Sequence, residues 1–171
     1  METSLFPSLP VLVVDDEEGA LFTIVAALRV GGVTRVLTCR DSREVMGLLS
    51  GQEMSVVMLD LTMPHLPGDV LLPQIVQQYP DTPVVVVTGA NDVDTAVQCM
   101  RLGAFDYMVK PCESQRIISG VKRAIELREL RAAYASLKEG MLSHELKHPE
   151  AFSAILTNSP KMLAVFRFAE T

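Results

Sequence analysis

Carboxylate, hydroxyl and ammonium side chains each follow a short, mostly apolar run in this chain, and together they could hold a cation and a phosphoryl group. Four such runs are followed or closed by the residues Asp15 and Asp16, Asp60, Thr88, and Lys110. If the runs are parallel strands, their carboxyl ends meet at one edge of a sheet, where open α/β proteins bind ligands. The order of these residues therefore predicts a single site at that edge.

Each residue has a chemical reason to be there. Asp60 is the candidate nucleophile, because a carboxylate can attack phosphorus. Asp15 and Asp16 offer the hard oxygen ligands that suit Mg²⁺, and a divalent cation relieves the repulsion between neighbouring carboxylates. Lys110 would neutralise charge on the transferred group, and the Thr88 hydroxyl could bond one of its oxygens. Taken singly, such residues are more often turn, cap or solvated residues, so the argument depends on the whole set.

Strand-like and helix-like segments alternate five times, which predicts an α/β fold with a five-stranded parallel sheet. The predicted strands are residues 11–15, 33–38, 55–60, 84–88 and 105–109. The predicted helices are residues 17–30, 41–51, 69–79, a helix capped by Asn91 or Asp92 and ended by Gly103, and a long helix from about 113 past 142. Asp41 with Glu44 resembles a capping box, and Pro73 in the first turns of the third helix predicts a mild kink.

The last helix is longer than a domain of this size needs. Its second part carries apolar residues at alternating spacings of three and four: Leu127, Leu130, Tyr134, Leu137 and Met141. This spacing is typical of a coiled-coil seam of about two heptads, so we expect a homodimer formed by paired helices. A solvated surface helix is the alternative. The following residues 143–150 are polar and contain Pro149, which indicates a linker.

The composition excludes several classes of protein. The 171 residues are 49% hydrophobic with a formal net charge of −6, and an acidic surface does not favour direct nucleic-acid binding. Three separated cysteines lack metal-ligand spacing, which favours free thiols in a reducing compartment. The amino terminus does not resemble a signal peptide, and no apolar run approaches the ~20 residues of a membrane span. We therefore expect a soluble cytoplasmic protein without membrane contact.

The motifs of this chain, taken in order, closely resemble the receiver domain of two-component response regulators. The resemblance covers about residues 8–127 and rests on Asp15-Asp16, Asp60 with Met63-Pro64 and Gly68, Thr88-Gly89, residues 103–107, and Lys110-Pro111. It implies a flavodoxin-like sheet flanked by helices. It also implies a phosphoacceptor that catalyses its own phosphorylation and dephosphorylation, rather than an enzyme that acts on other substrates.

The resemblance implies a role for each acidic residue. Asp60 would accept a phosphoryl group from a sensor histidine kinase. Asp16 and Asp60, together with the backbone carbonyl of Thr62, would ligate Mg²⁺, and Asp15 would act through a water molecule.

The resemblance also implies a conformational switch. Thr88 would move toward the phosphoryl group, Tyr107 would turn inward, and Lys110 would contact the phosphoryl oxygens. The bond between Lys110 and Pro111 would be cis, an isomer that only X-Pro bonds adopt at low cost.

The carboxyl-terminal residues resemble a second family. Residues 155–162 with Val165-Phe166 are similar to the opening of the AAA+ domain of sigma-54-dependent activators, the nitrogen-regulatory protein C family. No G-x-x-x-x-G-K-[ST] phosphate loop is present, so this chain is not expected to hydrolyse ATP. The predicted organisation is a receiver at 8–127, a coiled-coil dimerisation linker at 128–150 and an AAA+ fragment at 151–171. This fragment leads us to expect that the rest of an AAA+ domain follows in the full protein. Through that part, the AAA+ domain and sigma-54 RNA polymerase would be partners.

Two other functions compete with a phosphorylation switch. An aspartyl-phosphate phosphatase of the haloacid-dehalogenase type needs an acid two residues after its nucleophile, but Thr62 occupies that position here. A purely structural dimerisation module would not need the full set of acids with Lys110. His65 lies beside the predicted site, where we expect a solvated loop residue; an influence on dephosphorylation is the alternative.

Overall fold

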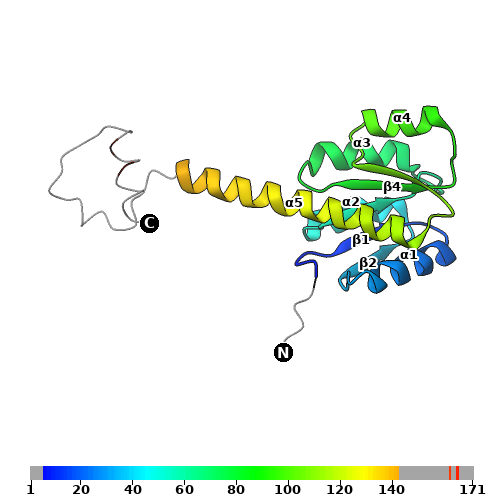
Figure 1. Cartoon of the computed structure of the whole chain (residues 1–171). Helices are drawn as coiled ribbons and strands as arrows, with labels where there is room; N and C mark the ends of the chain where they lie inside the picture. Colours follow the sequence, from blue (N-terminus) through cyan, green and yellow to red (C-terminus); the bar gives the residue numbers. More distant parts are fainter. Residues whose placement is uncertain (1–5, 143–161, 163–164, 166–171) are drawn as a thin grey trace. The chain divides into compact units, whose positions relative to one another are not determined.

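The computed structural model describes residues 6–142 together with residues 162 and 165. Five strands form one sheet in the order β2-β1-β3-β4-β5, and every neighbouring pair is parallel. The strands are β1 (Val11–Val14), β2 (Val36–Cys39), β3 (Val56–Leu59), β4 (Val84–Thr88) and β5 (Asp106–Val109). The α/β class and the five-stranded parallel sheet are confirmed (Figure 1).

Helices cover both faces of the sheet (Figure 1). They are α1 (Glu18–Val30), α2 (Val45–Gly51), α3 (Gly68–Gln78), α4 (Val93–Arg101) and α5 (Ser114–Leu142), with a short 3₁₀ helix η1 (Ser42–Glu44) before α2. Residues of α1 and α5 pack on one face, and residues of α2, α3 and α4 pack on the other. β1, β3 and β4 are buried on both faces, and their sequences are apolar rather than alternating, apart from Thr88 at the end of β4.

Two elements differ from the sequence prediction by more than one residue at an end or in helix type. The second strand begins at Val36 rather than residue 33, because Val33 closes the end of α1 by donating its N–H to the carbonyl of Leu28 at 2.9 Å. The helix predicted from Asp41 begins as the 3₁₀ turn η1, where the Asp41 carboxylate accepts the backbone N–H of Arg43 at 3.0 Å.

The helix after β4 is capped by Asp92, one of the two predicted caps. Its carboxylate accepts the N–H of Thr95 at 2.7 Å, and this hydrogen bond lowers the pKa of Asp92. Gly103 follows the helix with φ +97°, a conformation that glycine adopts at little cost. In α3, Pro73 lies inside the helix, which continues from Gly68 to Gln78.

The chain divides into two compact units, residues 1–130 and residues 131–171. The predicted domain boundaries at residues 127 and 150 stay predictions. Three residues of the predicted seam are well exposed, Leu130 at 68%, Tyr134 at 68% and Leu137 at 64%. The side chain of Met141 and the predicted linker residues 143–150 lie outside the described residues, as does the predicted AAA+ fragment except residues 162 and 165.

Among the residues that the structure describes, no helix is both long enough and apolar enough to cross a bilayer.

Candidate functional site

The register of the central strands brings two acids together. Val14 of β1 pairs with Leu59 of β3, so Asp15 and Asp60 follow equivalent positions on neighbouring strands. The backbone continues the ladder, since Asp60 donates its N–H to the carbonyl of Val14 at 3.0 Å. Both carboxylates are deeply buried, with Asp15 1% exposed and Asp60 4% exposed.

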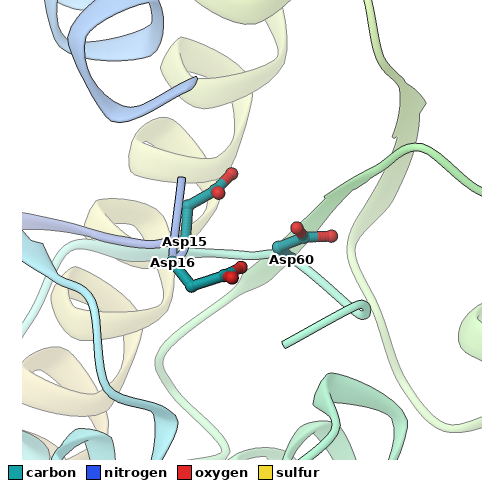
Figure 2. Close-up of side chains that lie close together, drawn as sticks. All are labelled: Asp15, Asp16 and Asp60. Carbon is teal, nitrogen blue, oxygen red and sulfur yellow. The ribbon is translucent and has the colours of Figure 1, made fainter. Parts of the chain in front are cut away.

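Asp16 completes an acidic cluster with these two residues. Carboxylate oxygens of Asp15, Asp16 and Asp60 lie within 4.8 Å of one another, and Asp16 is the half-buried member. Figure 2 shows the three side chains close together, two from the segment after β1 and one from the end of β3. The sequence prediction that these acids meet at one edge of the sheet therefore agrees with the geometry.

Lys110 joins the cluster from the end of β5. Its ammonium nitrogen lies 2.6 Å from Asp15 Oδ2 and 2.9 Å from Asp60 Oδ2. The backbone N–H of Lys110 donates to the carbonyl of Thr88 at 2.8 Å, which fixes the start of this loop against β4. The peptide bond between Lys110 and Pro111 is cis.

The electrostatics of the cluster follow from burial and pairing. Burial raises the pKa of Asp15, and the hydrogen bonds from Lys110 and from the N–H of Glu17 offset this only in part. Burial alone would lower the pKa of Lys110, but its hydrogen bonds to Asp15 and Asp60 outweigh that effect and raise it. The raised pKa of Lys110 keeps its ammonium group protonated at neutral pH. Three carboxylates facing one ammonium leave excess negative charge, which attracts a cation.

The acidic cluster fits a divalent cation. Its oxygens are hard ligands, and Mg²⁺ binds such ligands at about 2.0–2.1 Å while keeping several waters. Two ligands of one Mg²⁺ lie at most about 4.2 Å apart at such bond lengths, so oxygens within 4.8 Å of one another are near the spacing that the ion needs. Asp16 is less buried than the other two, so the cluster is accessible to solvent on the side of this residue.

The loop after Asp60 is held close to the site. Asp60 Oδ1 accepts the N–H of Thr62 at 3.2 Å, and Gly68 donates its N–H to the carbonyl of Leu61 at 2.9 Å. A Cβ atom at Gly68 would lie 2.1 Å from the backbone oxygen of Asp60, so only glycine allows this approach. The sequence motif included Gly68, and this contact gives the physical reason.

The two residues of the predicted switch meet at a third residue that the sequence did not single out. Thr88 is fully buried, and its hydroxyl oxygen accepts the N–H of Ala90 at 3.4 Å. The Tyr107 hydroxyl donates to the carbonyl of Ala90 at 2.6 Å, and burial raises the pKa of Tyr107. Ala90 thus links Thr88 to Tyr107 through its backbone, which has no signature in the sequence.

Other predicted features stand apart from this cluster. The side chain of Thr62 is exposed, and His65 is exposed with φ +70°. All three cysteines are free, and burial raises the pKa of each thiol.

A parallel sheet with three carboxylates and one lysine at its carboxyl edge defines a protein of the receiver class. The family model described as the response regulator receiver domain matches residues 11–122, and the chain belongs to this family.

Characterised relatives agree with this membership. The chain is 35% identical over 137 residues to the C4-dicarboxylate transport transcriptional regulatory protein DctD of Pseudomonas aeruginosa, covering 80% of this chain and 29% of that protein. It is 36% identical over 115 residues to the DNA-binding transcriptional regulator NtrC of Salmonella typhimurium, covering 67% of this chain and 24% of that protein. The chain therefore spans less than a third of the length of these relatives.

Solved structures give the same result. NtrX from Brucella abortus superposes with a TM-score of 0.69 at 30% identity, covering 77% of this chain and 30% of that one. A response regulator receiver domain protein from Clostridium thermocellum superposes with a TM-score of 0.66 at 33% identity, covering 71% of this chain and 98% of that one. The second match spans almost the whole of a receiver domain.

Proposed function

We propose that this chain is the phosphorylation-dependent switch of a two-component response regulator, with Asp60 as the phosphoacceptor. The observation that carries the proposal is the position of Lys110, whose ammonium bridges Asp15 and Asp60 at 2.6 and 2.9 Å within an acidic cluster. A structural module would gain nothing from burying these charges together, because desolvation of ions opposes folding.

The chemistry assigned to Asp60 is one in-line displacement. A carboxylate oxygen of Asp60 forms a bond to phosphorus, the phosphorus–nitrogen bond of the kinase phosphohistidine breaks, and its electron pair returns to the imidazole. Lys110, already 2.9 Å from Asp60 Oδ2, follows the phosphoryl oxygens and neutralises their charge. With acetyl phosphate as donor, the phosphorus–oxygen bond breaks and acetate leaves.

The acidic cluster is assigned to Mg²⁺. When bound, the ion would neutralise the negative charge that gathers on the transferred group. Asp16 and Asp60, with the backbone carbonyl of Thr62, would hold the ion directly, and Asp15 would hold it through water.

Phosphorylation is then communicated through Ala90. If Thr88 turns its hydroxyl toward a phosphoryl oxygen, its contact with the N–H of Ala90 is lost. The carbonyl of Ala90 holds the Tyr107 hydroxyl at 2.6 Å, so movement of this backbone changes the position of Tyr107. The surface formed by α4, β5 and α5 would respond, and with it the way two subunits pair through the exposed apolar residues of α5.

The proposal extends to partners outside this chain. A sensor histidine kinase supplies the phosphoryl group, and a homodimer forms through residues 127–141. The longer relatives DctD and NtrC are named as transcriptional regulators, which supports a downstream AAA+ domain that acts on sigma-54 RNA polymerase. This acidic chain, with a formal net charge of −6, would itself contact neither DNA nor a membrane.

The chain is proposed to be a phosphoacceptor rather than an enzyme with turnover on other molecules. Thr62 supplies no carboxylic acid two residues after the nucleophile, so an alkoxide leaving group would receive no proton there. A phosphatase would be indicated instead by sustained release of p-nitrophenol from p-nitrophenyl phosphate.

Labelling with acetyl phosphate in the presence of Mg²⁺ tests the acceptor. We expect the wild-type chain to gain the mass of one phosphoryl group, and Asp60→Asn to gain none while keeping its fold. Asp81→Asn, which changes an exposed aspartate outside the cluster, is the matched control and should label normally. Labelling of Asp60→Asn at the wild-type rate would disprove the assignment.

A further inference from the structure

The loop between β3 and α3 contains a strained turn. Among the residues that the structure describes, His65 is the one non-glycine residue with positive φ, at +70°. The N–H of Leu66 donates to the carbonyl of Pro64 at 2.9 Å, so the three residues form a γ-turn around His65. A γ-turn with positive φ is rare and costs conformational energy, and such a backbone persists only where its surroundings enforce it.

One buried hydroxyl enforces this turn from another part of the chain. Ser42 Oγ donates to the carbonyl of Pro64 at 3.2 Å and accepts the N–H of Leu66 at 3.3 Å, reaching 22 and 24 residues along the sequence. Ser42 is 1% exposed, so water does not compete for these bonds. The same two backbone groups that close the γ-turn are therefore also bound by Ser42.

Ser42 is itself held in place by its own element. It is the first residue of η1, and the Asp41 carboxylate before it accepts the N–H of Arg43 at 3.0 Å. The anchor of the loop thus belongs to the turn that leads into α2, and not to the strand that carries the acceptor.

The loop carries the backbone carbonyl that the proposed metal site requires. Thr62 lies between two attachment points, the Asp60 carboxylate that accepts its N–H and the γ-turn that begins at Pro64. Gly68 closes the base of the loop on Leu61. Met63 and Leu66 pack against the core, and among the described hydrogen bonds those of Ser42 tie this segment to a distant part of the chain.

We propose that Ser42 is a positioning residue for phosphoryl transfer, which fixes the β3–α3 loop so that the Thr62 carbonyl faces the cation site. This inference rests on the proposed function, because it assigns a task to Ser42 only if the acidic cluster binds Mg²⁺. Ser42 acts through the loop and not on the phosphoryl group.

The test compares two buried serines in the full 171-residue chain. Ser42→Ala is expected to raise the dissociation constant for Mg²⁺, measured by calorimetric titration of the unphosphorylated protein, by about tenfold, the lower end of what loss of an outer-shell partner causes. Ser55→Ala is the matched control, since Ser55 is 3% exposed and its hydroxyl donates to the carbonyl of Leu9 at 2.5 Å. Its Mg²⁺ affinity should stay within about twofold of wild type, well below that effect.

Two further measurements separate positioning from a general loss of stability. In Ser42→Ala, the rate of labelling by acetyl phosphate should fall at low Mg²⁺ and return to the wild-type rate at saturating Mg²⁺. Its Leu66 amide should also exchange with solvent faster than in wild type, while in Ser55→Ala it should not.

Equal Mg²⁺ affinity in Ser42→Ala and wild type would overturn the inference, as would an equal loss in both serine variants. The proposed function fails in a different way, through absence of labelling in the wild type. In that case the Mg²⁺ titration of Ser42→Ala still decides whether this serine positions the cation site.

Discussion

The carboxyl edge of the sheet and the second part of α5 differ in which side chains are buried and which are exposed. At the sheet edge, charged groups are buried, and Lys110 binds two carboxylates within 2.9 Å. Along α5, apolar side chains are exposed, with Leu130, Tyr134 and Leu137 at 64–68%. The first region pairs two of its carboxylates with a lysine of the same chain, whereas the second has its apolar surface open to a partner.

This difference indicates where each region gets its stability. Buried ions are tolerated only when they are paired and hydrogen-bonded, so the sheet edge depends on partners supplied by the fold itself. An exposed apolar stripe gains free energy only when another surface covers it. Substitutions at the edge should therefore change the stability of a single chain, and substitutions in the stripe should change association.

The largest effect is expected at Lys110. Lys110→Met keeps the aliphatic part of the side chain but leaves two buried carboxylates without their cation, which should lower the free energy of unfolding by about 3–5 kcal/mol. Urea denaturation in EDTA measures this loss, and added Mg²⁺ should restore part of it. Lys122 on α5 bonds neither acid, so Lys122→Met is the control and should lower the free energy of unfolding by less than about 1 kcal/mol. If Lys110→Met is as stable as wild type in EDTA, the charges of the site are not balanced by this pairing.

An intermediate effect is expected in the stripe, and it should appear as dissociation. Replacing Leu130 and Leu137 together by aspartate should raise the dimer dissociation constant at least about 100-fold, or about 2.7 kcal/mol, since each tenfold is about 1.4 kcal/mol. Sedimentation with Mg²⁺, with and without beryllofluoride as a phosphoryl mimic, measures the association and its dependence on activation.

The receiver unit of this double variant should keep its unfolding temperature. Val30→Asp, at an 85% exposed position of α1, is the control for adding charge to an exposed apolar site and should leave the dimer intact. A wild-type chain that stays monomeric in both activation states would contradict the proposed role of the stripe.

The smallest effect is expected at Asp15, and it depends on pH. Because burial raises the pKa of Asp15 above its ordinary value of 3.8, the folded state binds this proton more tightly than the unfolded state. The ionised carboxylate thus opposes folding at neutral pH, and this cost disappears as the pH falls through the raised pKa toward 3.8. Asp15→Asn, which cannot ionise, should be more stable than wild type at pH 8 in EDTA, by about 1 kcal/mol or about 4 °C.

A pH series of the same comparison tests whether Asp15 titrates with a raised pKa. The advantage of Asp15→Asn should shrink steadily in urea denaturation from pH 8 to pH 4, and Mg²⁺ should stabilise this variant less than it stabilises wild type. A difference that is constant with pH would show that Asp15 does not titrate with a raised pKa.

Much of the architecture was predictable because apolar strands and helical spacing are local signals. The strand ends were predictable too, and their order along the chain is enough to place Asp15, Asp16 and Asp60 at one edge of the sheet. The start of β2 was predicted three residues early, because Val33 is β-branched and apolar like a strand residue but packs at the end of α1.

The contacts that tune the site were not predictable from the sequence. Ser42 reaches a loop 22 residues away through backbone groups, and backbone acceptors are the same for every residue type. Ala90 joins Thr88 and Tyr107 in the same manner. Such links depend on where the tertiary structure places a carbonyl or an N–H group, so residue types do not predict them.

The pairing of Val14 with Leu59 has a consequence for insertions and deletions. Side chains alternate along a strand, so losing one residue within β3 would exchange its two faces and turn Asp60 away from Asp15. The same deletion would turn apolar side chains of β3 from one helix layer to the other. A change of length in β3 therefore cannot damage the acceptor without also damaging the core, whereas changes of length in surface loops away from this edge leave both intact.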